Sequence, residues 1–592
     1  MRFLFRNVWI KFWMDNPQKK NLIFFLILYR NIYNIPLIII VWVRQTNMKN
    51  LIIIFTLVLI AIPISSVSAI GVEHITGNIL TASASPGEII ALSCSVPYPM
   101  LGEPVNLVIV AEGNAGERFN ETVTVTDDFH GLIAADGDMT WDSGNVPISH
   151  TIMTIGTFPT STKKIAWYPS VVGNHTFHVA AGSFPEKQFN VSVGFDVEGI
   201  IAPSLGYPSI IIKNSTHELS VILSELRNST EEPLQLIKVE LQTVGGTAQY
   251  QLQNQTATWR TWITAGESTL QDELVARYNT DSVHDGFYNI SVTTAKKIYT
   301  WPHAVKIMGS EPTEYTVVQF TDTHIGKYAN FANKKKELTR LITYANEHLH
   351  PDFLIISGDS VDWYNEKCRR NAFADLREAL LTSTAPLFTV PGNHERYGNP
   401  LLFLYFPFTN LTPYHRFLNP LNDYSLKYGN VNFVFLDSGY DYSRWEIKRQ
   451  IWNTTPEGSG LTDTQMYLLE HTWGDSQVNQ IIALHHPAVY DKNDTGLGAL
   501  PNNLTSGNDG CIAFNRAAFI NYCVDSTVSL VLAGHSHESH VFTSLGKVSS
   551  NSSAWPLFVQ TRSSTLSGQN NGGRVVHIKN GIVVSYDYAS FK

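Results

Sequence analysis

The chain has 592 residues, a net charge of −9, and a composition of 44% hydrophobic and 11% aromatic residues, which is typical of a folded protein with several domains. The charge is uneven, because residues 1–50 hold eight basic residues and one acidic residue, which leaves 34 basic and 50 acidic residues, a net of −16, in the rest. This acidic charge over residues 51–592 disfavours a nucleic-acid partner, because proteins bind nucleic acids largely by releasing counterions from the phosphate backbone. It favours a small substrate.

Residues 48–69 have the layout of a secretory signal peptide. A short basic start at residues 48–50 precedes an apolar run over 51–62, and Val67-Ser68-Ala69 supplies the small residues of a cleavage site. We therefore expect cleavage after Ala69 and a secreted, extracellular or cell-surface protein. A buried apolar helix is the alternative interpretation.

Residues 1–47 allow two interpretations. The apolar runs 22–28 and 35–43 are interrupted by Arg30, Asn31 and Asn34, whereas a membrane span needs about 20 apolar residues. Either translation begins at Met48 and the upstream residues are a doubtful extension, or they form an imperfect membrane segment. We favour the first interpretation.

Glycosylation motifs agree with export. Sequons that lack proline occur along the whole chain, and this density predicts a glycoprotein. Their asparagines are Asn120, Asn174, Asn190, Asn214, Asn228, Asn254, Asn289, Asn410, Asn453, Asn493, Asn503 and Asn551. Of the four cysteines, Cys511 and Cys523 could close a short disulfide loop in an oxidising compartment, or both could be buried free thiols.

Residues 70–195 and 196–310 each predict a β-sandwich domain. Short alternating runs are separated by Gly, Pro, Asn and Asp clusters, without a helical period. The stretch from Trp167 to Val179 resembles the closing hairpin of immunoglobulin-like modules on microbial surface proteins. In the second domain we expect Trp259, Trp262 and Trp301 to belong to the core.

From Tyr315 onward, apolar strand runs alternate with amphipathic helical runs, which predicts an α/β domain over residues 311–592. We expect strands at 315–321, 353–357, 387–390, 432–436, 480–484 and 528–532, and helices at about 330–348, 367–382, 462–472 and 515–525. In such folds the functional residues collect on loops at the carboxyl ends of the strands.

Five short segments with metal-ligand residue types each follow one of these strands. They are Asp322-Thr323-His324, Gly358-Asp359-Ser360-Val361-Asp362, Gly392-Asn393-His394-Glu395, His485-His486-Pro487 and Gly534-His535-Ser536-His537. Each segment alone is weak, but two neighbouring cations need several oxygen and imidazole ligands and a bridging carboxylate. The glycines permit tight turns and close approach of the backbone to a ligand.

The series resembles the signature of calcineurin-like metallophosphoesterases: Asp-X-His, Gly-Asp-X-X-Asp, Gly-Asn-His-Asp/Glu, a later His, and Gly-His-X-His. The resemblance covers about residues 315–540. It implies a four-layer α/β/β/α sandwich with two metal ions, which could be Mn, Fe, Zn or Co. It further implies that Asp322, His324 and His537 hold one metal, that Asn393, His485 and His535 hold the other, and that Asp359 bridges them. His485 is preferred over His486 because the family ligand lies two residues before the proline.

The resemblance also implies a mechanism, in which a hydroxide shared by the two metals attacks phosphorus in line with the leaving oxygen. His394 is the candidate that protonates the leaving oxygen or holds the phosphoryl group, and Asp362 is the carboxylate that orients it. The alternative interpretation of Asp362 is a helix cap.

One departure bears on the substrate. Purple acid phosphatases of the superfamily have Tyr where this chain has Asp362, and protein phosphatases tend to have Arg where it has Trp363. A phosphodiester substrate is therefore favoured over a phosphomonoester. We expect Arg396, Tyr397, His415, His486 and the loop 491–509 to surround the site. Arg562, Arg574 and His577 could contact phosphate, but we expect them to be ordinary surface residues.

A different class of function is a cell-surface binding or adhesion protein whose phosphoesterase domain is incidental or inactive. The two β domains and the dense sequons favour that alternative, and both interpretations allow association with the cell envelope or a membrane surface. The complete ligand set opposes it, because a decayed site would have lost ligands.

Overall fold

A computed structural model of the chain forms two compact units, Met1–Thr76 and Gly77–Lys592. The structure describes residues 8–13, 21–29, 36–44, 88–94, 98–103, 105–112, 119–135, 138–155, 160–167, 169–181, 185–213, 218–264, 269–326, 331–362, 366–396, 411–439, 460–474, 477–489, 512, 515–544, 546–548, 554–565 and 571–591. The predicted signal peptide at 48–69 lies outside these residues.

The first unit contains one antiparallel sheet of three strands, β1 (Val8–Trp13), β2 (Asn21–Tyr29) and β3 (Pro36–Arg44), paired in chain order. The apolar runs predicted within residues 1–47 therefore form strands. Among the helices that the structure describes, none is long and apolar enough to cross a membrane.

The first β module occupies residues 88–193 and has two antiparallel sheets that share one apolar core. Trp167 and Phe177 meet edge to face in that core, with ring centroids 4.8 Å apart. One sheet is β4 (Glu88–Cys94), β5 (Val105–Glu112) and β8 (Thr160–Trp167); the other is β10 (Lys187–Val193), β9 (Val172–Ala181), β6 (Phe119–Ala135) and β7 (Asp138–Ile155).

The second β module, residues 199–308, is a sheet of eight strands, in which the long strand β15 pairs with β14 through its first residues and with β16 through the rest. Trp262 and Trp301 are buried as expected, but Trp259 is 45% exposed, so its assignment to the core was wrong. The strand order is β11 (Gly199–Ala202), β13 (Glu218–Asn228), β16 (Thr269–Asn279), β15 (Gln249–Thr264), β14 (Leu236–Thr243), β17 (Gly286–Thr294), β18 (Ile298–Met308) and β12 (Ser209–Ile212).

The C-terminal domain has two sheets that pack face to face. The five-stranded sheet is β21 (Leu387–Val390), β20 (Phe353–Ser357), β19 (Glu314–Phe320), β29 (Gly572–Lys579) and β30 (Ile582–Ser590). The seven-stranded sheet is β22 (Tyr424–Tyr428), β23 (Val431–Phe435), β24 (Asn479–Ala483), β25 (Val528–Ala533), β28 (Leu557–Gln560), β26 (His540–Thr543) and β27 (Gly546–Lys547). One apolar cluster contains residues of both sheets, such as Val317 and Phe433.

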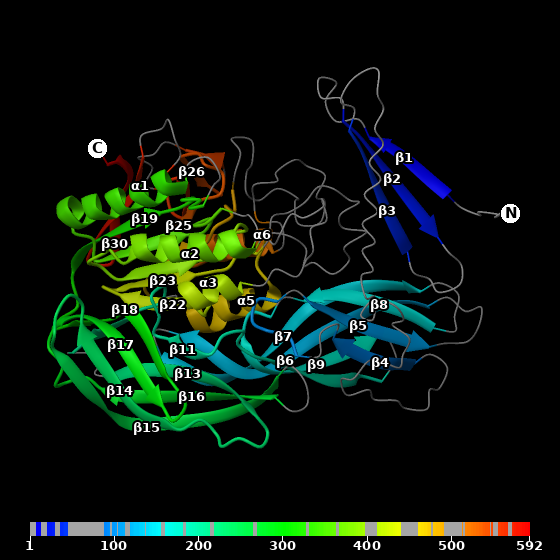
Figure 1. Ribbon diagram of the computed structural model, residues 1–592, viewed down its shortest axis with the longest axis horizontal. Helices are drawn as coiled ribbons and strands as arrows, with labels where there is room; N and C mark the ends of the chain where they lie inside the picture. The colour runs from blue at the N-terminus through cyan, green and yellow to red at the C-terminus, as the bar shows by residue number, and fades with distance from the viewer. Residues whose placement is uncertain are drawn as a thin grey trace. The chain divides into compact units, whose positions relative to one another are not determined.

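Helices pack against each of the two sheets. The long helices α1 (Phe331–Tyr344) and α2 (Glu366–Leu380) lie next to each other (Figure 1), and their apolar residues share a cluster with Val318 of β19. On the other sheet, α5 (Asp463–Leu468) and α6 (Arg516–Asp525) share a cluster with Ile482 of β24. Short elements complete the domain: η2 (Ala345–Leu349), α3 (Thr412–Phe417) and η4 (Leu469–Trp473).

These elements agree with the expected strands and helices to within a few residues, because fully buried parallel strands read as continuous apolar runs. Two further expectations concerned single side chains, and the one for Arg574 was wrong. Arg574 is 2% exposed and donates to the main-chain oxygens of Tyr586 and Gln560, so it is a structural residue and not a surface one. Cys523 is a buried free thiol, whereas Cys511 lies outside the described residues.

Candidate metal centre

The five predicted segments meet at one edge of the two sheets. Strands β19, β20 and β21 run parallel to one another, as do β24 and β25, so that their carboxyl ends and the loops that follow lie together. Main-chain hydrogen bonds join the loops directly, for example from Asp322 N to Gly358 O at 3.1 Å and from Gly534 N to His485 O at 3.0 Å.

Most of the predicted ligands have a left-handed backbone conformation. The φ angles are 52° at Asp322, 44° at His324, 46° at Asp359, 66° at His535 and 56° at His537. This region is unfavourable for residues other than glycine and costs about 1–3 kcal/mol each. The loops therefore orient these side chains at a cost in conformational free energy, which the rest of the fold must offset.

Glycine lets the loops approach the ligands. A Cβ atom on Gly392 would lie 2.4 Å from Asp359 Oδ1, and one on Gly534 would lie 2.5 Å from Asp322 Oδ2. Any other residue at these two positions would push a carboxylate out of place.

Asp322, His324 and His537 form the first cluster. His324 Nε2 lies 3.0 Å from His537 Nε2, and His537 Nε2 lies 3.2 Å from Asp322 Oδ1. Asp322 is fully buried. Three electron-pair donors thus converge on one point, which fits a divalent cation better than it fits a hydrogen-bonded core.

Asn393, His485 and His535 form the second cluster. His485 Nε2 lies 3.0 Å from Asn393 Oδ1 and 3.3 Å from His535 Nδ1. His485 Nδ1 lies 2.9 Å from the carbonyl oxygen of Ser357, which fixes the ring so that Nε2 faces the cluster. The neighbouring His486 also has a ring nitrogen within 4.8 Å of those of His485 and His535, and its Nδ1 lies 2.8 Å from Ser438 Oγ.

Asp359 lies between the two clusters. Its Oδ1 is 3.2 Å from His485 Nε2, and its Oδ2 is 4.0 Å from His324 Nε2. One carboxylate thus presents one oxygen to each cluster.

The electrostatics of the centre fit cations. Burial lowers the pKa of His324 to about 3, which leaves its ring neutral and able to donate an electron pair to a metal. Burial opposes the charge of Asp359, but His394 and His485 outweigh burial and hold its pKa well below the usual range. Burial alone would lower the pKa of His485, but the carboxylate of Asp359 raises it to about 10. Without a metal, the ring therefore carries a proton, and this positive charge balances the carboxylates as a bound cation would.

His394 lies at the more open side of the centre, with 18% of its side chain exposed. Its Nδ1 is 3.3 Å from Asp362 Oδ1, and its Nε2 is 3.6 Å from Asp359 Oδ2. Burial opposes protonation, but the two carboxylates outweigh it and raise the pKa of His394 above its ordinary value. The ring can therefore hold a proton near neutral pH.

Glu395 has a role that the sequence did not reveal. Its buried carboxylate accepts main-chain hydrogen bonds from Gly392 (2.6 Å), Asp359 (3.0 Å), Ser360 (2.8 Å) and Val361 (3.1 Å). It thereby ties the loop after β20 to the loop after β21. The available signals were its place directly after Asn393 and His394 and the Asp/Glu that ends the Gly-Asn-His-Asp/Glu signature.

A second group of supporting residues follows β28. Ser563 Oγ donates to Asp322 O at 2.7 Å, and Thr565 Oγ1 donates to Thr323 O at 2.6 Å, which braces the loop after β19. The rule that polar residues follow strand ends would have found them, but their segment contains no metal-ligand residue type.

Two residues expected around the site are not part of it. Arg396 is fully buried and forms an ion pair with Asp437. His415 is also fully buried and lies 2.6 Å from Asp196 Oδ1 and 2.7 Å from Asn422 Oδ1. Both residues make buried structural contacts outside the metal centre. Tyr397 and the loop 491–509 lie outside the described residues.

Comparison with known families identifies this region, because residues 315–539 match the model of the calcineurin-like phosphoesterases. These residues are a calcineurin-like phosphoesterase domain. The five segments of the metal centre all lie within the matched residues. The domain implies that the protein is a metal-dependent hydrolase of phosphoester bonds, and members of this family typically bind two metal ions.

Other comparisons add little. Among solved structures, a purple acid phosphatase, PPD1, from seeds of yellow lupin (Lupinus luteus) is 11% identical over 84% of this chain and 95% of its own, with a TM-score of 0.36. The titin Ig tandem domains A164-A165 are 14% identical over 38% of this chain and 100% of their own, with a TM-score of 0.16. TM-scores this low support no conclusion about the fold, which rests on the observed sheets alone. No curated protein matches the chain.

Proposed function

We propose that the protein is a secreted hydrolase that cleaves phosphoester bonds with two metal ions, and that it prefers phosphodiesters to phosphomonoesters. The position of Asp359 carries the proposal, because its two carboxylate oxygens face two separate clusters of ligands. A shared carboxylate is what two neighbouring cations require.

The chain supplies a ligand set for each cation. Asp322, His324 and His537 would hold one ion, Asn393, His485 and His535 would hold the other, and Asp359 would bridge them. Oxygen and imidazole ligands of this kind accept Mn, Fe, Zn or Co. When bound, the ions would neutralise phosphoryl oxygens and lower the pKa of a water molecule enough for it to attack phosphorus.

His394 would protonate the leaving oxygen. Asp362 contacts its Nδ1 at 3.3 Å and so orients the ring, which leaves Nε2 to carry the proton toward the substrate. The carboxylates raise the pKa of His394, so the imidazolium form needed for this step is populated near neutral pH.

The preference for diesters rests on the family resemblance. The chain has Asp362 where the purple acid phosphatases have Tyr, and Trp363, which lies outside the described residues, where the protein phosphatases have Arg. Both differences separate it from branches that act on monoesters.

Export is supported by the signal-peptide pattern at 48–69 and by the exposure of sequons. Asn174, Asn190, Asn228 and Asn254 are exposed on the β modules, so a glycan could be attached at each.

We also propose a four-layer α/β/β/α arrangement for the phosphoesterase domain and an immunoglobulin-like fold for the β modules. The packing of α1 and α2 on one sheet, and of α5 and α6 on the other, supports the first assignment. The shared core of the two sheets in the first β module supports the second.

The test is hydrolysis of bis(p-nitrophenyl) phosphate and p-nitrophenyl phosphate by the full chain, first stripped of metal and then loaded with Mn²⁺. We expect both to be cleaved only after loading, with the diester cleaved faster. A faster monoester reaction would contradict the preference for diesters. Cleavage of neither substrate would overturn the enzymatic proposal and favour the binding or adhesion function.

A further inference from the structure

A sixth polar segment, Asp437-Ser438, lies at the same sheet edge as the five segments of the metal centre. It follows β23, which runs parallel to β24, so that it lies beside the loop that contains His485 and His486. Asp437 is 1% exposed, and Ser438 is fully buried. Neither residue was among the predicted ligands, yet their side chains contact two loops of the metal centre.

Ser438 fixes the ring of His486. Its Oγ accepts a hydrogen bond from His486 N at 3.0 Å and lies 2.8 Å from His486 Nδ1. One oxygen atom thus contacts both the main chain and the ring, so the ring cannot rotate without losing a buried polar contact, which is costly. The ring in turn packs against two predicted ligands, with ring centroids 5.0 Å from His485 and 4.4 Å from His535.

Asp437 anchors the segment to the loop after β21. Its carboxylate forms an ion pair with the buried guanidinium of Arg396, and Arg396 N donates to Asn393 O at 3.1 Å. Asp437 N donates to Asp423 Oδ1 at 2.7 Å. Burial and the charge of Asp437 raise the pKa of Asp423 well above its usual range. Asp423 is therefore neutral, and Asp437 supplies the negative charge that a buried guanidinium requires.

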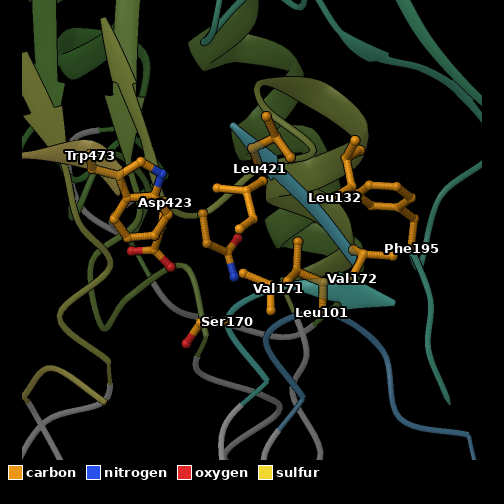
Figure 2. A pocket seen from close by; sticks show the side chains of 11 residues that line it. Leu101, Leu132, Ser170, Val171, Val172, Phe195, Leu421, Asp423 and Trp473 are labelled. Atoms are coloured by element: carbon orange, nitrogen blue, oxygen red, sulfur yellow. The ribbon is translucent and has the colours of Figure 1, made fainter. Parts of the chain in front are cut away.

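The first β module adjoins the residues behind this segment. Gln465 Nε2 donates to Asp423 Oδ1 at 2.7 Å and to Asp437 O at 2.8 Å. Gln465 also forms the capping box of α5 with Thr462, whose Oγ1 lies 2.9 Å from Ser170 Oγ of the module. Ser170 and Asp423 both line a small cavity between the module and the phosphoesterase domain (Figure 2). The module thus helps to bury the residues that support the segment.

We propose that Ser438 is a positioning residue of the metal centre. It acts through His486, whose ring supports the second ligand cluster, and the ion pair of Asp437 with Arg396 holds the segment in place. The proposal rests on the proposed two-metal function, because Ser438 itself binds neither metal nor substrate.

His486 supports ligands without being one. A ring nitrogen of His486 lies within 4.8 Å of those of His485 and His535, close enough to share a cation with them. The second ligand cluster and Asp359, however, already offer four ligands, which is the number that a tetrahedral metal site holds. His486 is also fully buried, so it presents no surface to a substrate.

Calorimetric titration of the metal-free full chain with Mn²⁺ tests the proposal on Ser438→Ala. We expect one of the two Mn²⁺ ions to bind about 10-fold more weakly than in the wild type, as is usual when a residue that orients a metal ligand is removed. The other ion should bind with an unchanged Kd, because Ser438 contacts no residue of the first ligand cluster.

Ser383→Ala is the matched control. Ser383 is 2% exposed, and its Oγ donates to Ala385 O at 2.7 Å and accepts from Ala385 N at 3.1 Å. The variant therefore also loses a buried hydroxyl with two main-chain contacts in one segment, but that segment precedes β21, whereas the metal loops follow the strands. Both Mn²⁺ ions should bind to Ser383→Ala as they do to the wild type.

The outcomes separate this proposal from the proposed function. Equal Mn²⁺ affinities in Ser438→Ala and the wild type, or the same loss in Ser383→Ala, would overturn the positioning role alone. A wild-type chain that binds fewer than two Mn²⁺ ions would overturn the two-metal function and the positioning role with it.

A crystal structure of the Mn²⁺-loaded wild type gives a second measurement. We expect His486 Nδ1 to remain in contact with Ser438 Oγ and neither ring nitrogen of His486 to bind Mn²⁺. A His486 nitrogen bound to the metal would make His486 a ligand and overturn the proposal.

Discussion

The metal centre and the second β module both bury several ionisable side chains, but they do so in opposite ways. In the module, the acids lie on regular strands and accept hydrogen bonds from side chains of the same module: Arg227 bonds Asp272 at 2.6 Å, and Thr294 bonds Glu225 at 2.6 Å. In the centre, ligand nitrogens and oxygens face one another, as in the 3.0 Å approach of His324 to His537, and the backbone is strained. Burial of charge alone therefore does not mark a functional site; strain combined with converging electron-pair donors does.

The largest effect should come from the residue between the two clusters. Asp359→Asn keeps the shape but removes the charge that faces both clusters, so we expect the hydrolytic rate to fall by a factor on the order of 10³. The variant should also bind fewer metal ions per chain. Asp525→Asn, at an exposed position in α6, is the control and should match the wild type. If Asp359→Asn is fully active, the buried charge of the metal centre is no more functional than the buried charge of the second β module, which would contradict the comparison.

Loss of the proton donor should have the next largest effect. His394→Ala should lower kcat by about 10²- to 10³-fold. Since His394 must be protonated to act, the activity of the wild type should fall as pH rises through its raised pKa, and the variant should lack that fall. The pH dependence of kcat for both proteins measures this, with exposed His471→Ala as the control. If the activity of His394→Ala still falls at high pH as it does in the wild type, His394 is not the residue that protonates the leaving oxygen.

Glu395 tests whether the support of the loops matters. A glutamine has one carbonyl oxygen, whereas the carboxylate accepts four main-chain hydrogen bonds, so Glu395→Gln should loosen both loops. We expect the Kd for Mn²⁺ to rise by about 10- to 100-fold. Calorimetric titration of the metal-free variant measures this, with exposed Glu538→Gln as the control. A wild-type Kd would show that the loops hold their geometry without this anchor.

The smallest effect should come from the second β module, and it concerns stability. Burial raises the pKa of Glu273 to about 8, although the hydrogen bond from Trp262 opposes the shift. Between the unfolded value of 4.5 and 8, only the folded state holds this proton, so the contribution of Glu273 to stability falls as pH rises, by roughly 1 kcal/mol per pH unit. Glu273→Gln should remove this dependence and be the more stable protein at pH 8.

Denaturant unfolding at pH 6 and pH 8 measures this difference, and Glu232→Gln, at an exposed position of the same module, is the control. If Glu273→Gln and the wild type lose equal stability between the two pH values, Glu273 does not titrate in the way its burial implies.

The sequence predicted the elements of the phosphoesterase domain closely, because the apolar runs of β20 and β24 are buried on both faces and cannot be mistaken for amphipathic helices. It also identified the segments that meet at the metal centre, since parallel strands bring their carboxyl ends together. It failed for Arg396 and His415, whose partners are distant in sequence: Asp196 precedes His415 by 219 residues. The pairing of such residues depends on how domains pack, and no local pattern records it.

The glycine and strain pattern of the centre was predicted only in part. Gly392 and Gly534 were expected to allow close approach, and the structure shows what they approach. The positive φ angles of Asp322 and His535 had no sequence signal, because neither residue type requires this conformation.

The most direct test of the two-metal claim is a titration of the metal-free full chain with Mn²⁺ while diester hydrolysis is measured. The account predicts that the rate stops rising at two equivalents of Mn²⁺ per chain, and that metal analysis of the active protein gives the same ratio. A rate that is already maximal at one equivalent, or that does not depend on metal, would contradict the account.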